Sequence, residues 1–114
     1  MKQIIIFTFL FSSICYSQTS SSSEKASFKV KGVCEMCEDR IEKGTVKLKG
    51  VKYADWDILS NNISLIYNSK KTDLDKIHRH ISMLGHSTDK YKAPEKIYNA
   101  LPECCKYETM EIHF

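Results

Sequence analysis

The stretch Val30-Lys31-Gly32-Val33-Cys34-Glu35-Met36-Cys37 joins two different hydrophobic periodicities in this sequence. Before it, apolar and polar residues alternate over residues 27–31, which predicts a half-buried strand that Gly32 ends. After it, apolar residues recur at helical spacing over residues 38–48, which predicts an amphipathic helix. The cysteine pair is therefore expected in a loop that leaves a strand and enters a helix.

The rest of the chain repeats this alternation of strand and helix. The patterns predict a strand over 51–58, a polar turn over 60–62, a strand over 63–67, a helix over 74–84 and a strand over 86–92. The order β-α-β-β-α-β is typical of an α+β, ferredoxin-like sandwich. We expect a four-stranded antiparallel sheet with both helices on one face, followed by a cysteine-containing C-terminal extension that begins with a short helix.

The N-terminal segment has the order of a secretory signal peptide. Residues 1–17 contain one positive charge, then an apolar run too short to span a membrane, then small and polar residues. A lipoprotein with Cys15 lipidated is the less favoured alternative, because Ile14 is a bulky neighbour for that processing. Residues 18–25 are serine-rich and predict a flexible linker, which leaves a domain over 26–93 and an extension over 94–114.

Composition excludes some classes of partner. The chain has 114 residues and a formal net charge of +3, without a basic stripe, so nucleic acid is not expected as a partner. After residues 1–17 no segment is apolar enough for stable membrane insertion. With cleavage of the signal peptide predicted over residues 1–17, the sequence predicts a periplasmic or secreted protein.

Cys34 and Cys37 form a CxxC pair, which can be a metal clamp, a disulfide or a redox dithiol. The N-terminus of the following helix favours thiolate over thiol, and thiolate is the form that binds metal. Two sulfur ligands suit Cu(I) best, with Hg(II) or Zn(II) as alternatives. We therefore favour metal binding without catalysis over a thiol-disulfide oxidoreductase or a metal-free, disulfide-stapled interaction module.

The stretch quoted first, together with Arg40-Ile41-Glu42-Lys43 and Leu48-Lys49-Gly50-Val51, resembles the heavy-metal-associated (HMA) domain family. The resemblance covers about residues 26–93 and implies a ferredoxin-like fold with Cys34 and Cys37 as metal ligands. The family usually reads G-M-T-C-x-x-C, whereas this chain has one residue fewer before its first cysteine. Val33 or Met36 is therefore expected to anchor the loop in the core.

Three further residues are candidate ligands. Cys104 and Cys105 could fold back and add thiolates, form a disulfide latch with the first pair, or stay an independent surface pair. His86 occupies the place where the family often has a side chain near the metal.

The resemblance also implies a class of function. It includes copper chaperones, modules of copper-exporting ATPases and periplasmic mercury-binding proteins. We expect Cu(I) sequestration or delivery, with a metal-transporting ATPase or another envelope metal-handling protein as partner. A dimer bridged by one metal ion is compatible with an exposed thiol loop.

Overall fold

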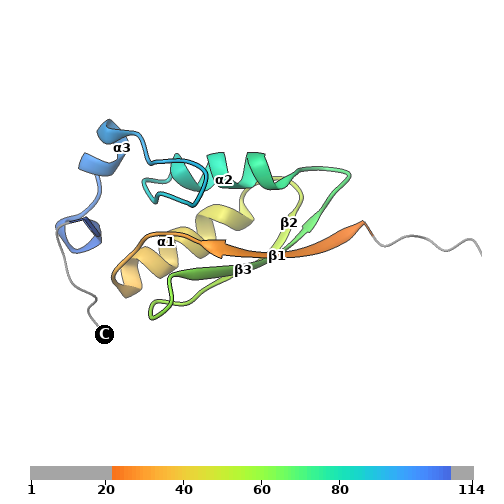
Figure 1. Cartoon of the computed structure of the whole chain (residues 1–114), viewed down its shortest axis with the longest axis horizontal. Helices are drawn as coiled ribbons and strands as arrows, with labels where there is room; N and C mark the ends of the chain where they lie inside the picture. Colours follow the sequence, from red (N-terminus) through yellow and green to blue (C-terminus); the bar gives the residue numbers. More distant parts are fainter. Residues whose placement is uncertain (1–21, 109–114) are drawn as a thin grey trace, which may run out of the picture.

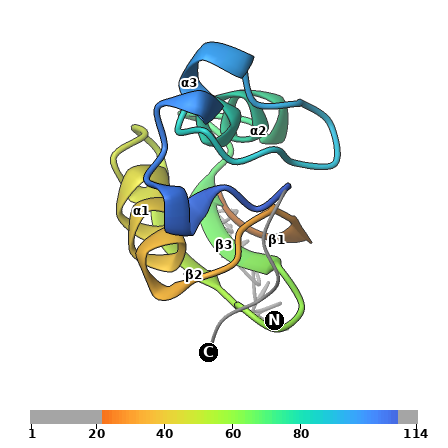
Figure 2. The same ribbon diagram turned by 90° about the vertical axis from the view of Figure 1, so that its left-hand side faces the viewer.

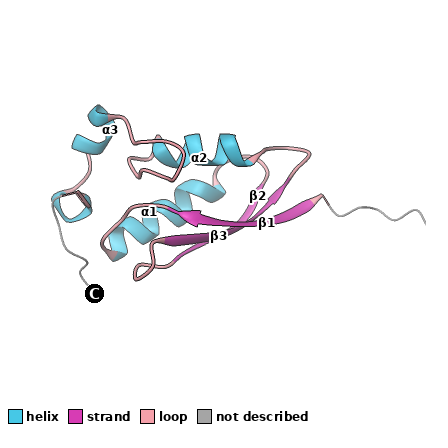
Figure 3. Cartoon of the chain, in the orientation of Figure 1, coloured by secondary structure: helices cyan, strands magenta, loops and turns pink. Residues whose placement is uncertain are grey.

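A computed structural model of the chain describes residues 22–108. Their elements, shown in Figure 3, are β1 (Ser23–Lys29), α1 (Glu35–Val46), β2 (Val51–Trp56), β3 (Asn62–Asn68), α2 (Leu74–Ser82), α3 (Glu95–Asn99) and the 3₁₀ helix η1 (Glu103–Cys105). The signal peptide predicted over 1–17 lies outside the described residues. Within them, no helix has the length and apolar character needed to cross a membrane.

The three strands form one antiparallel sheet in the order β1-β3-β2. β3 is central, and its residue Leu65 lies opposite Ala26 of β1 and Ala54 of β2. Helices α1 and α2 cover one face of this sheet (Figure 1). The prediction of an α+β fold with two main helices over an antiparallel sheet is therefore confirmed.

The prediction of a fourth strand over 86–92 is wrong. In the described part of the chain this segment pairs through one isolated bridge, between Val30 and Thr88. The carboxylate of Asp89, rather than a backbone carbonyl, accepts the Lys29 amide at 3.2 Å. The Thr88 hydroxyl accepts the amides of Lys90 and Tyr91, so the chain bends away from the sheet edge.

The first strand begins earlier than the hydrophobic pattern predicts. Residues 23–25, assigned to the linker on composition, pair with residues 66–68 of β3. Backbone pairing with a long central strand does not require an apolar side chain, because the amide and carbonyl groups supply the hydrogen bonds. The rest of the predicted linker, residues 18–21, lies outside the described residues.

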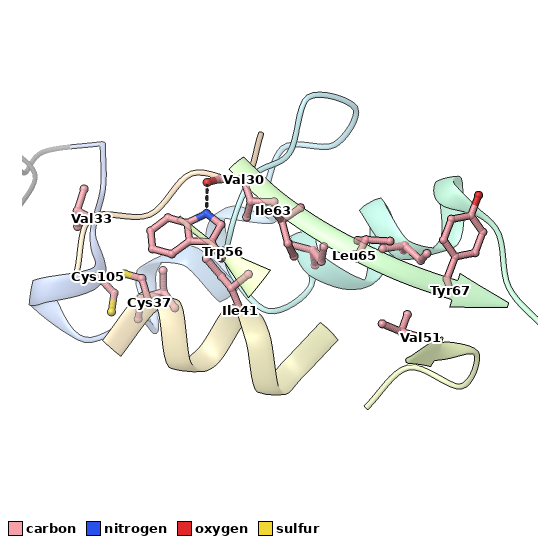
Figure 4. Packing of buried hydrophobic residues seen from close by; sticks show 13 residues of the cluster. Val30, Val33, Cys37, Ile41, Val51, Trp56, Ile63, Leu65, Tyr67 and Cys105 are labelled. Carbon is pink, nitrogen blue, oxygen red and sulfur yellow. Dashed lines mark hydrogen bonds between the residues drawn. The ribbon is translucent and has the colours of Figure 1, made fainter. Parts of the chain in front are cut away.

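The core lies between the sheet and the two helices. The largest fully buried side chains include Trp56 of β2, Ile41 of α1 and Ile77 of α2. Gly44 allows α1 to approach the turn that follows α2 closely, because a Cβ atom there would lie 2.5 Å from the Leu84 side chain. Figure 4 shows this core running along the sheet from Tyr67 to the cysteines.

The C-terminal extension folds back over one end of the domain (Figure 2). The short helix expected after residue 94 is α3, and η1 follows it beside α1. Leu101, between the two, is buried against Gly85. The Tyr107 hydroxyl donates to the Gly85 carbonyl at 2.9 Å and accepts the Ser87 amide at 3.1 Å. These contacts attach the tail to the segment after α2.

Candidate metal centre

The loop before α1 is held in place by Trp56. The indole Nε1 donates to the Val30 carbonyl at 2.9 Å, and a Cβ on Gly32 would meet the indole at 2.8 Å. Val33 is 4% exposed, so it occupies the apolar position in this loop. The loop is therefore packed on the core on both sides of the turn that leads to Cys34.

Cys34 and Cys37 lie side by side at the start of α1. Cys34 is the N-cap residue with extended backbone, and Cys37 follows in the first helical turn. Their sulfur atoms are 3.3 Å apart. Cys37 is buried, whereas Cys34 is half-buried, so the pair is reached from solvent at the Cys34 side.

The extension brings two further thiols to this pair. The sulfur of Cys105 lies 3.5 Å from that of Cys34 and 4.0 Å from that of Cys104. The ligand atoms of Cys34, Cys104 and Cys105 all lie within 4.8 Å of one another. The four cysteines among residues 22–108 are free thiols, and the tail pair lies beside the first pair instead of forming an independent surface pair.

Met36 is not a core anchor, contrary to one of the two alternatives drawn from the sequence. Its side chain is 53% exposed. The Cys104 thiol donates to the Met36 thioether at 3.4 Å. Because Val33 already fills the apolar position, the first helical turn can direct Met36 outward, over the tail cysteines.

The environment lowers the pKa of one thiol and raises the others. Burial acts to raise the pKa of Cys34, but the amides of Cys37 and Met36 and the neighbouring thiols outweigh it and lower that pKa. Burial raises the pKa of Cys37 and, together with the Cys37 thiol, raises that of Cys105 to about 12. Cys34 is therefore the thiol that ionises first.

A cation lies next to the buried thiols. The guanidinium of Arg40, one turn after Cys37 on α1, opposes the rise in the pKa of Cys105. Its Nη1 atom is buried without a hydrogen-bond partner. A buried, unpaired donor of this kind favours negative charge beside it.

His86 does not join the sulfur cluster. Its side chain is fully buried, and Nδ1 lies 2.8 Å from the Lys31 carbonyl, so Nδ1 carries the proton and Nε2 is the bare acceptor. Burial lowers the pKa of His86 to about 4. Among residues 22–108, the ligand group that contains the tail cysteines is made of thiols alone. His86 instead joins the segment after α2 to the loop before Cys34.

Several features of the site carry no clear signal in the sequence. The contact of Arg40 with Cys105 and the role of Trp56 under the loop depend on tertiary packing. The adjacent cysteines at 104 and 105 indicated a possible metal-binding role in the sequence. Only the packing of the C-terminal extension against the domain shows that Cys105 is the buried one.

The donor set is chemically narrow. Thiols are soft ligands, and a group of three whose sulfur atoms lie within 4.8 Å of one another favours Cu(I), Zn(II) and similar ions over hard cations. Oxygen ligands, which Mg²⁺ and Ca²⁺ require, are not part of the described cluster.

Comparison with known proteins agrees with this fold and cysteine pair. No family model matches the chain. The chain is 33% identical over 73 residues, 63% of its length, to a copper-transporting ATPase of Helicobacter pylori, and it spans about a tenth of that relative.

Two solved structures illustrate the likeness in three dimensions. The N-terminal domain of a potential copper-translocating P-type ATPase from Bacillus subtilis, in its Cu(I)-loaded state, is 30% identical with a TM-score of 0.55. The match covers 58% of this chain and 84% of that domain. Oxidized MerP from Ralstonia metallidurans CH34 has a TM-score of 0.56 at 19% identity, covering 59% and 94% of the two chains, and shows likeness of fold alone.

The sheet, its two covering helices and the loop with its cysteine pair define a small ferredoxin-like α+β domain that lacks a regular fourth strand among residues 22–108. Together with the 30% identity over most of the Bacillus subtilis domain, they show that the chain belongs to the heavy-metal-associated domain family.

Proposed function

We propose that this chain is a non-catalytic metal-binding protein that takes up Cu(I) through Cys34 and Cys37. The observation that supports this most directly is the 3.3 Å separation of the two sulfurs at a helix N-terminus. The lowered pKa of Cys34 favours its thiolate over its thiol, and thiolate is the form that binds soft metals. Hg(II) has the same ligand preference and is the alternative ion.

The same proposal includes where the protein works. The signal peptide predicted over residues 1–17 would place it in the periplasm or outside the cell. There it would sequester Cu(I) or pass it to a metal-transporting ATPase or another envelope metal-handling protein. The relatives support such a partner, since the H. pylori relative is named as a copper-transporting ATPase.

A competitive titration tests the proposal. The reduced protein is titrated with Cu(I) in the presence of a chelator of known affinity, and the same is done with the variant Cys34→Ser/Cys37→Ser. We expect tight binding by the wild type and its loss in the double variant. Equal Cu(I) retention by both proteins would contradict the proposal.

Thiol-disulfide exchange is the second candidate, because two sulfurs 3.3 Å apart with one lowered pKa also suit a redox dithiol. Insulin reduction distinguishes the two functions. A catalytic oxidoreductase would accelerate insulin reduction by dithiothreitol and would not need to hold Cu(I) against the chelator.

A further inference from the structure

The extension places Cys105 in the interior, next to the metal-binding loop. Its side chain is fully buried, and its sulfur lies 3.5 Å from that of Cys34. Figure 4 shows Cys105 on η1 beside Cys37 on α1. Close packing in the interior fixes the position of the Cys105 thiol beside the two other thiols, whereas an exposed cysteine side chain could turn away from them.

The fold holds Cys105 there through contacts on both sides of η1. Before it, Leu101 packs on Gly85. The Cys105 amide donates to the Pro102 carbonyl at 2.8 Å, which closes the 3₁₀ turn. After it, the Tyr107 hydroxyl binds the Gly85 carbonyl. The thiol is therefore preorganised, and little ordering of the chain is needed for it to bind a ligand.

The two sulfur separations that involve Cys34 suit one shared ion. A metal–thiolate bond of about 2.3 Å, as found for zinc, places three sulfurs around one ion roughly 4 Å apart. The two separations from Cys34, 3.3 Å to Cys37 and 3.5 Å to Cys105, need only a small expansion to reach that value.

A third thiolate adds negative charge to the buried centre, and the Arg40 guanidinium can balance that charge. One Cu(I) ion with two thiolates has a net charge of −1, and a third thiolate makes it −2. Burying this charge without a cation is unfavourable. The Arg40 guanidinium lies beside Cys105 and has a buried Nη1 atom without a partner, so it can donate to the third thiolate.

We propose that Cys105 is a third ligand to the Cu(I) ion bound by Cys34 and Cys37, and that Arg40 balances the added charge. This inference rests on the proposed function. It assigns this chain a closed, three-thiolate site that retains its ion, in place of an open two-thiolate site. Cys104 is half-buried, donates a hydrogen bond to the Met36 thioether and lies at the solvent side of the closed site.

X-ray absorption on the wild-type protein, reduced and loaded with one equivalent of Cu(I), counts the ligands directly. We expect three sulfur atoms around copper. Two sulfur atoms would overturn the proposal while leaving the proposed function intact. This measurement needs no variant, so it does not depend on how a substitution affects folding.

Competitive titration of variants identifies the third sulfur. We expect Cys105→Ser to weaken Cu(I) affinity at least about tenfold and the matched variant Cys104→Ser to weaken it less. An unchanged affinity in Cys105→Ser, or a larger loss in Cys104→Ser, would overturn the assignment. Failure of the wild type itself to bind Cu(I) would instead refute the proposed function.

A double-mutant cycle tests the role of Arg40. Arg40→Gln should weaken Cu(I) binding in the wild type and have a smaller effect in Cys105→Ser, because the charge it balances is then absent. Equal effects in both backgrounds would show that Arg40 acts on folding or on the first pair, and would overturn its assignment. Circular dichroism of each apo variant shows whether the fold is kept.

Discussion

The sulfur of Cys105 lies 3.5 Å from the sulfur of Cys34, although 71 positions separate them in the sequence. The contact exists because the extension crosses the end of the domain where the loop enters α1 (Figure 2). It links the reactivity of the cysteine pair to the docking of the tail.

The thiols should react with iodoacetamide in a defined order. In the reduced, metal-free protein at neutral pH we expect Cys34 to be alkylated first, because its pKa is lowered and its sulfur is half-exposed. Cys105 should be last, since it is buried and its pKa is raised to about 12. Peptide mass mapping over time measures the order. In denaturant the order should disappear, and equal rates for both residues in the folded protein would contradict the prediction.

Removing the Tyr107 hydroxyl should loosen the tail. Tyr107→Phe leaves the Gly85 carbonyl and the Ser87 amide without this partner, at a cost of about 1–3 kcal/mol. We expect faster alkylation of Cys105. Tyr91→Phe is the matched control, because the Tyr91 hydroxyl donates to Asp75 of α2 and not to the tail. Equal Cys105 rates in wild type and Tyr107→Phe would argue against this anchor.

Gly85→Ala should disturb the tail more than Gly50→Ala does. Both glycines have positive φ, +104° and +102°, so alanine is strained at each by roughly 1–3 kcal/mol. At Gly85 the new Cβ would also lie 2.8 Å from Leu101, which precedes η1, whereas at Gly50 it meets Lys71 and Thr72.

Fluorescence of Trp56, the single tryptophan, measures unfolding by denaturant in both variants. Comparable losses of stability are expected, with faster Cys105 alkylation in Gly85→Ala alone. The reverse pattern, with Gly50→Ala exposing Cys105, would show that Leu101 does not position the thiol.

Stability of the metal-free protein should fall in mild acid because of His86. Its pKa is lowered from an ordinary 6.5 to about 4 by burial, so between these values the unfolded chain binds more protons than the folded one. Stability is therefore lost as pH falls from about 6.5 towards 4, by up to about 3 kcal/mol.

Burial also lowers the pKa of His78, so wild-type denaturation curves contain both contributions. The difference between wild type and His86→Gln isolates His86, since glutamine can still donate to the Lys31 carbonyl and does not titrate. An identical pH dependence in the two proteins would show that His86 stays neutral in both states or is not buried in solution.

Much of the architecture follows from local patterns. Alternation over 27–31 and 63–67 and helical spacing over 38–48 and 74–84 predict β1, β3, α1 and α2, with ends that differ by a few residues. These elements are amphipathic, and burial of one face is a property of nearby residues. The prediction of a fourth strand was wrong because the Asp89 carboxylate accepts the Lys29 amide in place of the backbone carbonyl that a paired strand would supply.

The sequence alone determined the cysteine pair and its place before a helix, because CxxC spacing and the turn at Gly32 are local features. Only the tertiary structure decided that Met36 faces outward, that His86 is buried beside the Lys31 carbonyl, and that Cys105 reaches Cys34. Those relationships join segments distant along the chain. They depend on how the extension packs against the domain, which spacing and hydrophobic periodicity do not encode.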